Sequence, residues 1–538
     1  MPGCILEGFS HSGSQVPNPL LIHTVLVLRN WCGLHPVMIV ALTAANAEIA
    51  PLTDFSDRVV PFTAVTWSCV IFPFLVLLAH EAAKTKPLLT NPQDANTMSF
   101  QISIMFFFFH WYVMEALLMP ISLDFAESMG QSATMSGFFL SSSMFPVFIA
   151  IVVSKRMVSE SNWDQANART LILGAQVIGS IVLLVKAVVA SSTVDRSVGT
   201  KQAVFWLLIC LGQICSFMQA LPLVPLMVMW AKITPNRERS YWSVWTQCAR
   251  NGGFLVGPAV FAIISLCVKQ GQPVAPVSVM AWIFFAQCII MQLATIYIAM
   301  ALPKALLPNE DEEIESEQTE PGVEELDAKQ RQEIVKQMIR YGFLRYFQTA
   351  SIEVSAIMLL ELSYDWPTES CGAVLTAVSF TSLLFAAFSA TLMSRKLVSE
   401  SVIFAASNHI ALLGAIFLFD FGTGAAGLMI ADALVYGCSS VSNGIAEGWG
   451  SKAAIPDTDC SQEAYQAWSY GSISVARFIA PMIARAMIAY GGRNVNAAAL
   501  LMMVAMACSI VHSATTMVWN HQSEKAEARE SMNLREKA

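Results

Sequence analysis

The sequence predicts an all-α, multi-pass membrane protein whose helices form two related halves. Three observations support this fold class. The 538 residues are 55% hydrophobic and only 13% charged, with a mean hydropathy of +0.55, whereas a soluble domain contains roughly a quarter charged residues. Twelve apolar runs long enough to cross a bilayer follow residue 100. The segment VSKRMVSES at 153–161 occurs again as MSRKLVSES at 393–401.

The repeated segment extends beyond its basic residues. Each copy directly follows an apolar run, at 141–152 and 381–392, and within these runs Phe145 matches Phe385 at the same offset. A repeat of a hydrophobic helix together with its basic exit loop indicates a chain of two related halves. Parallel repeats of this kind are known from membrane transporters.

The twelve predicted spans divide equally on the two sides of an acidic segment. A membrane helix needs ~20 mainly apolar residues, because the hydrocarbon layer is ~30 Å thick and a helix rises ~1.5 Å per residue. The predicted spans are 101–122, 133–153, 169–190, 203–231, 240–268, 278–301, 340–362, 370–393, 402–420, 422–446, 463–489 and 496–519.

The N-terminal segment, 1–98, is expected to add one or two accessory membrane helices. Residues 60–80 contain no charge before the final His and predict a span, whereas 21–49 are interrupted by Arg29 and Asn30. This weaker stretch predicts either one helix at about 33–50 or an interfacial segment followed by a helix. The start of the sequence lacks the basic region of a cleavable signal peptide, so we expect insertion through the first membrane helix.

An acidic linker, 303–338, separates the two predicted six-helix bundles, 99–302 and 339–520, and a tail follows at 521–538. Ten of the 39 acidic residues lie between Glu310 and Asp327 in this linker. The remaining chain is close to neutral, so we expect no nucleic-acid partner. Low hydrophobicity and high charge favour a disordered linker, although its second part has the pattern of a short amphipathic helix.

The distribution of Lys and Arg predicts the orientation. These residues concentrate in the loops after the even-numbered spans, while the other loops hold only Arg196, Lys201, Lys269 and Arg493. Basic loops face the cytoplasm, which places both ends of the core there. The pattern does not distinguish the plasma membrane from an endomembrane such as that of a vacuole or lysosome.

The order of six helices, a long charged cytoplasmic loop and six more helices resembles the major facilitator superfamily (MFS) of secondary transporters. The basic pairs Lys155/Arg156 and Arg395/Lys396 fall where this family has a Gly-x-x-x-Asp-Arg/Lys motif, although the Gly and Asp are absent here. The resemblance implies that these four side chains stabilise one gating state at the cytoplasmic face.

A second resemblance lies in the fifth span, where Gly253, Gly257 and Pro258 form the facilitator pattern Gly-x-x-x-Gly-Pro. Small residues let helices approach closely and Pro permits bending, so these residues are predicted to serve conformational change or simply a packed, kinked helix. Residues 106–130 are similar to the branch that contains vacuolar phosphate carriers and lysosomal ceroid-lipofuscinosis-type carriers.

Glu115 and Glu353 lie in the middle of the first and seventh spans, which are equivalent in the two halves. An ionisable group at mid-span costs ~2.5–3.5 kcal/mol, so such groups usually face a cavity or a partner. A carboxylate in a low-dielectric site has a raised pKa and can exchange protons near neutral pH. The two glutamates therefore predict proton coupling, with structural pairing to an arginine as the alternative.

Arg250 and Arg477 are the predicted substrate-binding cations, because a guanidinium suits a carboxylate or phosphate. Their alternative role is to neutralise the two glutamates. Asp432 is a weaker cavity candidate, and Lys186 and Arg485 are expected to snorkel to the membrane interface.

Gln213 and Gln219 are six residues apart in the fourth span and point ~120° away from each other on a helix of ~3.6 residues per turn. Only one is expected to face the cavity, where it could bind polar groups of a substrate beside Trp245. An interfacial aromatic belt also explains tryptophans in this region.

No ATP- or dinucleotide-binding motif, nucleophile elbow or metal-type Cys/His spacing occurs in the sequence. We therefore expect no enzyme activity, no cofactor and no metal. The predicted function is transport of a small organic or anionic solute by a monomer in the lipid bilayer, with protons as a possible second partner. A transport-inactive receptor or scaffold with the MFS fold is the alternative.

Overall fold

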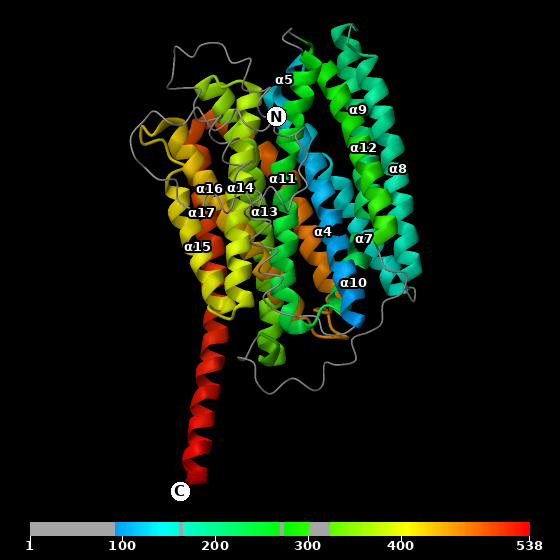
Figure 1. The fold of residues 1–538 in the computed structure, drawn as a ribbon. Coiled ribbons are helices and arrows are strands. Elements are labelled where there is room, and N and C mark those ends of the chain that lie inside the picture. The colour runs from blue at the N-terminus through cyan, green and yellow to red at the C-terminus, as the bar shows by residue number, and fades with distance from the viewer. Residues whose placement is uncertain (1–91, 161–164, 195, 270–273, 302–322, 538) are drawn as a thin grey trace, which may run out of the picture. The chain divides into compact units, whose positions relative to one another are not determined.

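The structure of the protein is a computed structural model, and its described part consists mainly of long apolar helices. The structure describes residues 92–160, 165–194, 196–269, 274–301 and 323–537, and these ranges contain no strand. The accessory helices predicted before residue 92 and most of the acidic linker lie outside the described residues. Figure 1 shows the described helices running roughly parallel to one another.

The first six predicted spans all lie on helices, but three of them are broken into two. The first span breaks at 119–121, the second at Ser142 and Ser143, and the fourth at Leu221 and Pro222. The first and fourth breaks contain a proline, which removes a backbone donor. The first-half helices are α4 (Pro92–Leu118), α5 (Ser122–Ser128), α6 (Ala133–Ser141), α7 (Met144–Glu160), α8 (Gln165–Ser191), α9 (Val198–Ala220), α10 (Leu223–Ile233), α11 (Arg239–Lys269) and α12 (Pro276–Ala301).

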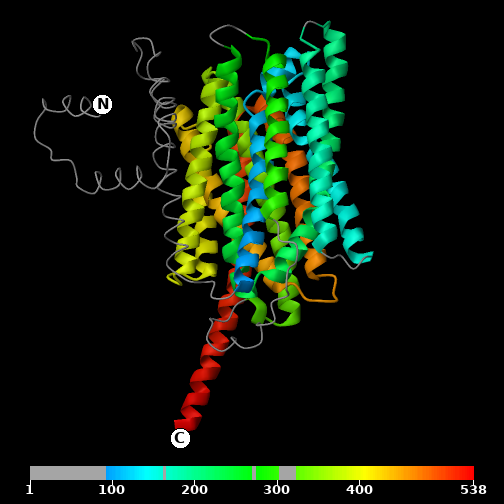
Figure 2. The ribbon, with the colours of Figure 1, turned by 45° about the vertical axis from the view of Figure 1, so that its right-hand side comes forward.

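The second half contains fewer and mostly unbroken helices. Its helices are α13 (Ala328–Tyr364), α14 (Thr368–Ser394), α15 (Glu400–Ile416), α16 (Gly424–Ala453) and α17 (Gln462–Lys537). α17 contains both last predicted spans, which meet at Gly492, where φ is +71°. Glycine adopts this left-handed conformation without the steric cost of a Cβ. The predicted tail continues α17 as helix (Figures 1 and 2).

α13 begins at Ala328, well before the predicted start of the second bundle at 339. Asp327 caps it: the carboxylate accepts from the Gln330 backbone N–H, and the Gln330 side chain accepts from Asp327 N–H. This capping box starts the helix. Arg331 then donates to backbone carbonyls at the end of α16, including that of Ala454 at 2.7 Å. The second part of the predicted linker is thus the first turns of a transmembrane helix.

Nine of the described helical segments are long and apolar enough to cross a membrane. α13 is not among them because Arg345 and Glu353 lower its hydropathy, and α15 has only 17 residues. The ninth segment includes both passes of α17. These helices confirm the predicted all-α membrane fold.

α11 and α17 contact both halves. α11 packs against α4 in its own half and against α14 and α16 in the other, and α17 packs against α13 but also reaches α6 and α7. We call the end where α11 begins and α16 ends the tail end, because the C-terminal part of α17 projects from it in Figure 1. The opposite end, near α5, is the far end. The sequence predicts that the tail end faces the cytosol.

Candidate functional site

Three charged side chains meet between the halves. One nitrogen, Nη2 of Arg477 on α17, lies 3.1 Å from Oε2 of Glu115 on α4 and 3.3 Å from Oε2 of Glu353 on α13. The side chains of Arg477, Glu115 and Glu353 are 7%, 17% and 2% exposed. We call them the Arg477 cluster. One cation is therefore shared by two carboxylates, which leaves one surplus negative charge when both are ionised.

Aromatic residues surround the Arg477 cluster. The Arg477 guanidinium lies 5.4 Å from the ring centroid of Tyr112 and 5.6 Å from that of Phe254, and Trp111 donates to Glu115 Oε1 at 3.1 Å. Oε1 of Glu353 is buried and accepts no hydrogen bond of normal geometry from the described residues, although the Tyr436 hydroxyl lies close to this carboxylate. A buried carboxylate with few donors is costly when charged, and protonation removes that charge.

The Arg477 cluster lines a cavity of about 100 Å³. Residues of both halves form its walls, so the site lies where the halves meet. Its polar and charged lining comprises Glu115, Ser141, Ser142, Ser143, Lys186, Ser216, Gln219, Gln287, Glu353 and Arg477. A smaller adjoining cavity contains Arg477 and Glu353 together with Arg250 and Gln247. The two glutamates thus face the same space, as the equivalence of their spans predicts.

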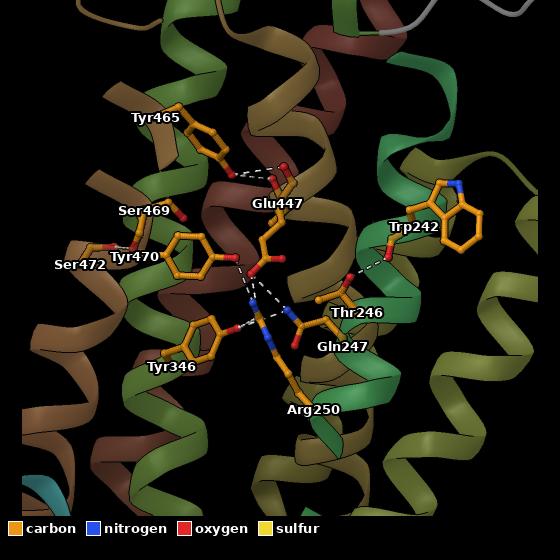
Figure 3. A network of polar contacts seen from close by, with 11 residues as sticks. Trp242, Thr246, Gln247, Arg250, Tyr346, Glu447, Tyr465, Ser469, Tyr470 and Ser472 are labelled. Carbon is orange, nitrogen blue, oxygen red and sulfur yellow. Dashed lines mark hydrogen bonds and ion pairs between the residues drawn. The ribbon is translucent and has the colours of Figure 1, made fainter. Parts of the chain in front are cut away.

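A second buried ion pair connects the halves on the tail side of the Arg477 cluster. Nη1 of Arg250 on α11 lies 2.8 Å from Oε1 of Glu447 on α16. Arg250 also donates to the hydroxyls of Tyr346 and Tyr470, and Gln247 donates to Glu447 (Figure 3). In contrast to the Arg477 cluster, this pair has one carboxylate for one guanidinium. Neutral side chains form the remaining hydrogen bonds of both groups.

Glu447 was not predicted. The predicted tenth span ends at 446, one residue before it, whereas α16 continues to Ala453. Two signals in the sequence indicate this residue. The segment GIAEGWG remains apolar beyond 446, and Gly444-x-x-x-Gly448 is a pattern typical of close helix contacts.

The glycines of α16 lie directly against α11. A Cβ at Gly448 would lie 2.3 Å from Ser240 Cα, and one at Gly444 would lie 2.6 Å from Val244 Cα. Ser240 also donates to Glu400 at 2.8 Å, and Glu400 accepts from Trp449 and pairs with Lys452 at 2.8 Å. We call this α11–α16–Glu400 contact the tail-end seam. It joins the two halves at the end predicted to be cytosolic.

The predicted gating residues occupy different environments. Nζ of Lys155 lies 5.7 Å from the Trp468 ring centroid, so it contacts the other half. Arg395 and Lys396 are exposed on the turn after α14. In this second copy of the repeat, Glu400 is the residue that contacts the first half, and Arg156 of the first copy is exposed on α7. The gating role of the basic pairs stays a prediction.

The predicted conformational glycines pack within the first half. A Cβ at Gly253 would lie 2.5 Å from the Phe109 carbonyl oxygen, and one at Gly257 would lie 2.5 Å from Ala116 Cβ, both on α4. Pro258 lies inside α11 one residue later. These residues permit close packing of α11 on α4, which fits the packing interpretation of their pattern.

Of the predicted polar substrate contacts, only one of the two glutamines lines a cavity, as their spacing on the helix predicts. Gln219 is buried and lines the large cavity, and it lies next to Met114 of α4. Gln213 is not among the lining residues of either cavity. Trp245 packs against Tyr241 at a centroid distance of 6.3 Å and lies outside both cavity linings.

The expectation that Lys186 and Arg485 snorkel to the interface is wrong, because both side chains are buried. Lys186 is 5% exposed and lines the large cavity. Arg485 is 1% exposed and donates to Ser122 Oγ at 3.0 Å, across the halves at the far end. Asp432 is buried but lies outside both cavity linings. No group of His, Cys, Asp and Glu in the described ranges could hold a metal ion.

A family model of the Major Facilitator Superfamily matches residues 102–451. The chain belongs to the major facilitator superfamily. It is therefore an integral multi-pass membrane protein and a transmembrane transporter, which confirms the predicted family. The likeness to the vacuolar phosphate and lysosomal branch stays a prediction. No curated protein matches the sequence.

Solved MFS structures share this fold at low identity. The human organic anion transporter MFSD10 (TETRAN) has a TM-score of 0.55 and 12% identity, over 78% of this chain and 100% of that chain. The proton:xylose symporter XylE has a TM-score of 0.56 and 11% identity, over 78% and 95%. FucP in the outward conformation has a TM-score of 0.51 and 12% identity, over 77% and 99%. At these identities the likeness shows the fold alone.

Proposed function

We propose that this MFS protein carries a small organic solute together with a proton, by alternating access of the central cavity to the two sides of the membrane. The single observation that supports this most strongly is the Arg477 cluster. Its two carboxylates come from opposite halves and share one guanidinium in a buried site. Considered without Lys186, such a cluster has one surplus negative charge when both carboxylates are ionised, and a proton can neutralise it.

Proton binding supplies that charge at the lowest structural cost. Coulomb interactions are strong in the low-dielectric interior, so an unbalanced carboxylate is unfavourable there. Oε1 of Glu353, which does not contact Arg477, can be protonated while Oε2 keeps its contact with that guanidinium. Because Glu115 and Glu353 belong to different halves, their protonation state can affect how the halves close on the cavity.

Contacts between the halves at both ends support alternating access. At the tail end, the seam joins α11 to Glu400 and α16. At the far end, Thr368 donates to Asp124 at 2.9 Å, and Arg485 donates to Ser122. Each set is small enough to open while the other is retained. This describes rocking of the two halves about the central cavity.

The basic connections and the Arg477 cluster also support a proposal for the orientation and the oligomeric state. We propose that the tail end faces the cytosol, because Lys and Arg concentrate in the connections at that end. We also propose that the monomer is the transporting unit, since one chain supplies Arg477 and both of its carboxylates. The solute class follows from the polar and charged cavity lining, and the human protein MFSD10, which shares this fold, is an organic anion transporter.

The test is uptake of a mixed panel of organic anions, amides and sugars into proteoliposomes, with and without an imposed proton gradient. We expect accumulation of one solute class only when the gradient is present. Equilibration that ignores the gradient would contradict proton coupling and leave a uniporter. Absence of flux for every solute would contradict the transport proposal and favour the scaffold alternative.

A further inference from the structure

We propose that Lys186 is an anion-binding residue of the central cavity and that it takes the carboxylate or phosphate group of a small organic anion. This inference deepens the proposed function, on which its transport consequence rests. Lys186 lies near the end of α8, is 5% exposed and lines the cavity that contains the Arg477 cluster.

The arrangement of α8 directs Lys186 inward. The same helix exposes Val177, Ile181, Leu184 and Val188, with exposed fractions of 45–60%. These positions form one apolar stripe at helical spacing, as expected for a surface in contact with lipid. Lys186 lies on the opposite side, among Leu183 and Ala190, which are buried. A lysine that served only to reach the membrane interface would lie beside the exposed stripe.

Lys186 has no ion pair and no hydrogen bond with any described residue. Its ammonium lies 4.1 Å from the ring centroid of Phe284, and a Cβ at Gly212 would be 3.5 Å from Nζ. A cation–π contact of this kind offsets only part of the cost of burying a charge. A buried ammonium normally has an anionic or hydrogen-bonding partner. The missing partner at Lys186 is what a bound anion would supply.

The arginines of the site are less available for this role. Arg477 already contacts two carboxylates, and Arg250 contacts Glu447 and two tyrosines. Lys186 is the cation of the cavity lining whose donors are not used by other described side chains. The remaining lining offers serine hydroxyls and the amides of Gln219 and Gln287, which can bind further polar groups of the solute.

Charge balance then links the anion to the proton. With both glutamates ionised, the cavity lining holds two positive groups, Lys186 and Arg477, and two negative groups, Glu115 and Glu353. An anion on Lys186 adds one negative charge, and a proton on the Arg477 cluster restores neutrality. The loaded cavity thus contains one anion and one proton, and the empty cavity contains neither. No other charged group lines this cavity in the described part of the chain.

The test measures binding to purified full-length protein, which needs no transport. Thermal unfolding is followed with benzoate, lactate, glutarate and inorganic phosphate, and with benzamide and lactamide as uncharged analogues. We expect one or more of the anions to stabilise the protein and their amides to fail. Lys186→Met should weaken the apparent affinity at least about tenfold, as expected for loss of a hydrogen bond to a charged group.

Two further variants keep the outcome interpretable. Lys186→Arg retains the charge and should retain anion binding, which guards against a Lys186→Met protein that folds poorly. Lys232→Met removes an exposed lysine of α10 and should bind as the wild type does. Equal anion affinity in wild type and Lys186→Met would overturn the assignment, and so would a wild-type protein that none of these anions stabilises.

The same variants separate this inference from the proposed function. Anion binding that depends on Lys186, without proton-driven uptake in proteoliposomes, would support the site and contradict the transport proposal. Proton-driven uptake that Lys186→Met leaves unchanged would support the transport proposal and overturn the site.

Discussion

The two buried arginines of the central region differ in their charge balance. Arg477 is shared by Glu115 and Glu353, whereas Arg250 has the single carboxylate of Glu447. A one-to-one pair is neutral while it is closed, so it can join the halves without binding anything else. A two-to-one cluster has a surplus negative charge that a proton can neutralise. This difference is the basis for the proposal that Arg477 takes part in proton coupling and Arg250 in closure of the two halves.

The largest effect is expected for Arg477→Met. This change leaves two buried carboxylates without a cation, and removal of one partner of a buried ion pair costs about 3–5 kcal/mol. We expect loss of uptake and a clear drop in the thermal midpoint of unfolding. Adding Glu115→Gln to this variant should recover part of the stability. An Arg477→Met protein with wild-type stability would show that the cluster is not an ionic unit.

The Arg250–Glu447 pair should behave as a coupled pair. Arg250→Met and Glu447→Gln each leave a buried group without its partner and should each cost about 3 kcal/mol or more. The double variant should be more stable than the sum of the two effects predicts, as is normal for residues in contact. Denaturant unfolding of all four proteins measures this. If the two changes in the free energy of unfolding simply add in the double variant, Arg250 and Glu447 do not interact directly.

The tail-end seam should tolerate no added methyl group. In Gly448→Ala the new Cβ would overlap the backbone of Ser240, so α11 and α16 must separate. We expect faster labelling of an Asn443→Cys probe by a membrane-impermeant thiol reagent added from the tail side. Gly174→Ala, whose Cβ would meet no atom within 4 Å, is the matched control. Equal labelling in both variants would argue against closure by the seam.

The smallest effect is expected for Glu400→Gln. Glu400 is 28% exposed, while its partner Lys452 is 6% exposed, so the change removes a partly solvated ion pair but keeps acceptors for Ser240 and Trp449. We expect a cost of about 1–2 kcal/mol, as for a hydrogen bond to a charged group. Glu333→Gln, in an exposed pair with Arg340, should cost less. Thermal unfolding in low and high salt compares the two.

The sequence was sufficient for the order of the helices and for four of the buried charges. Glu115, Glu353, Arg250 and Arg477 each interrupt an apolar run, and an ion in such a run requires a partner or a cavity. The structure brings all four to the central region. Their pairing could not be predicted, because it depends on how helices far apart in the sequence rotate against each other.

Lys186 and Glu447 show two physical reasons for a missed residue. The residues around Lys186 are almost all Val, Leu, Ile and Ala, so hydrophobic periodicity does not mark which face of α8 is buried. The sequence therefore does not distinguish a lysine that points into the protein from one that points toward lipid. Glu447 was missed because the predicted span ended at 446, although the Gly444-x-x-x-Gly448 pattern indicates that the helix continues into a close contact, which the structure shows between Gly448 and Ser240.

The most direct test of the account is Glu353→Gln in proteoliposomes, with the solute that the uptake panel identifies. Solute and proton fluxes are measured together, first under an imposed proton gradient and then as solute exchange without one. We predict that the variant loses gradient-driven accumulation and proton flux but keeps exchange, because the glutamine cannot take up the proton. Accumulation and proton flux equal to those of the wild type would contradict the proposal that the surplus carboxylate of the Arg477 cluster couples transport to protons.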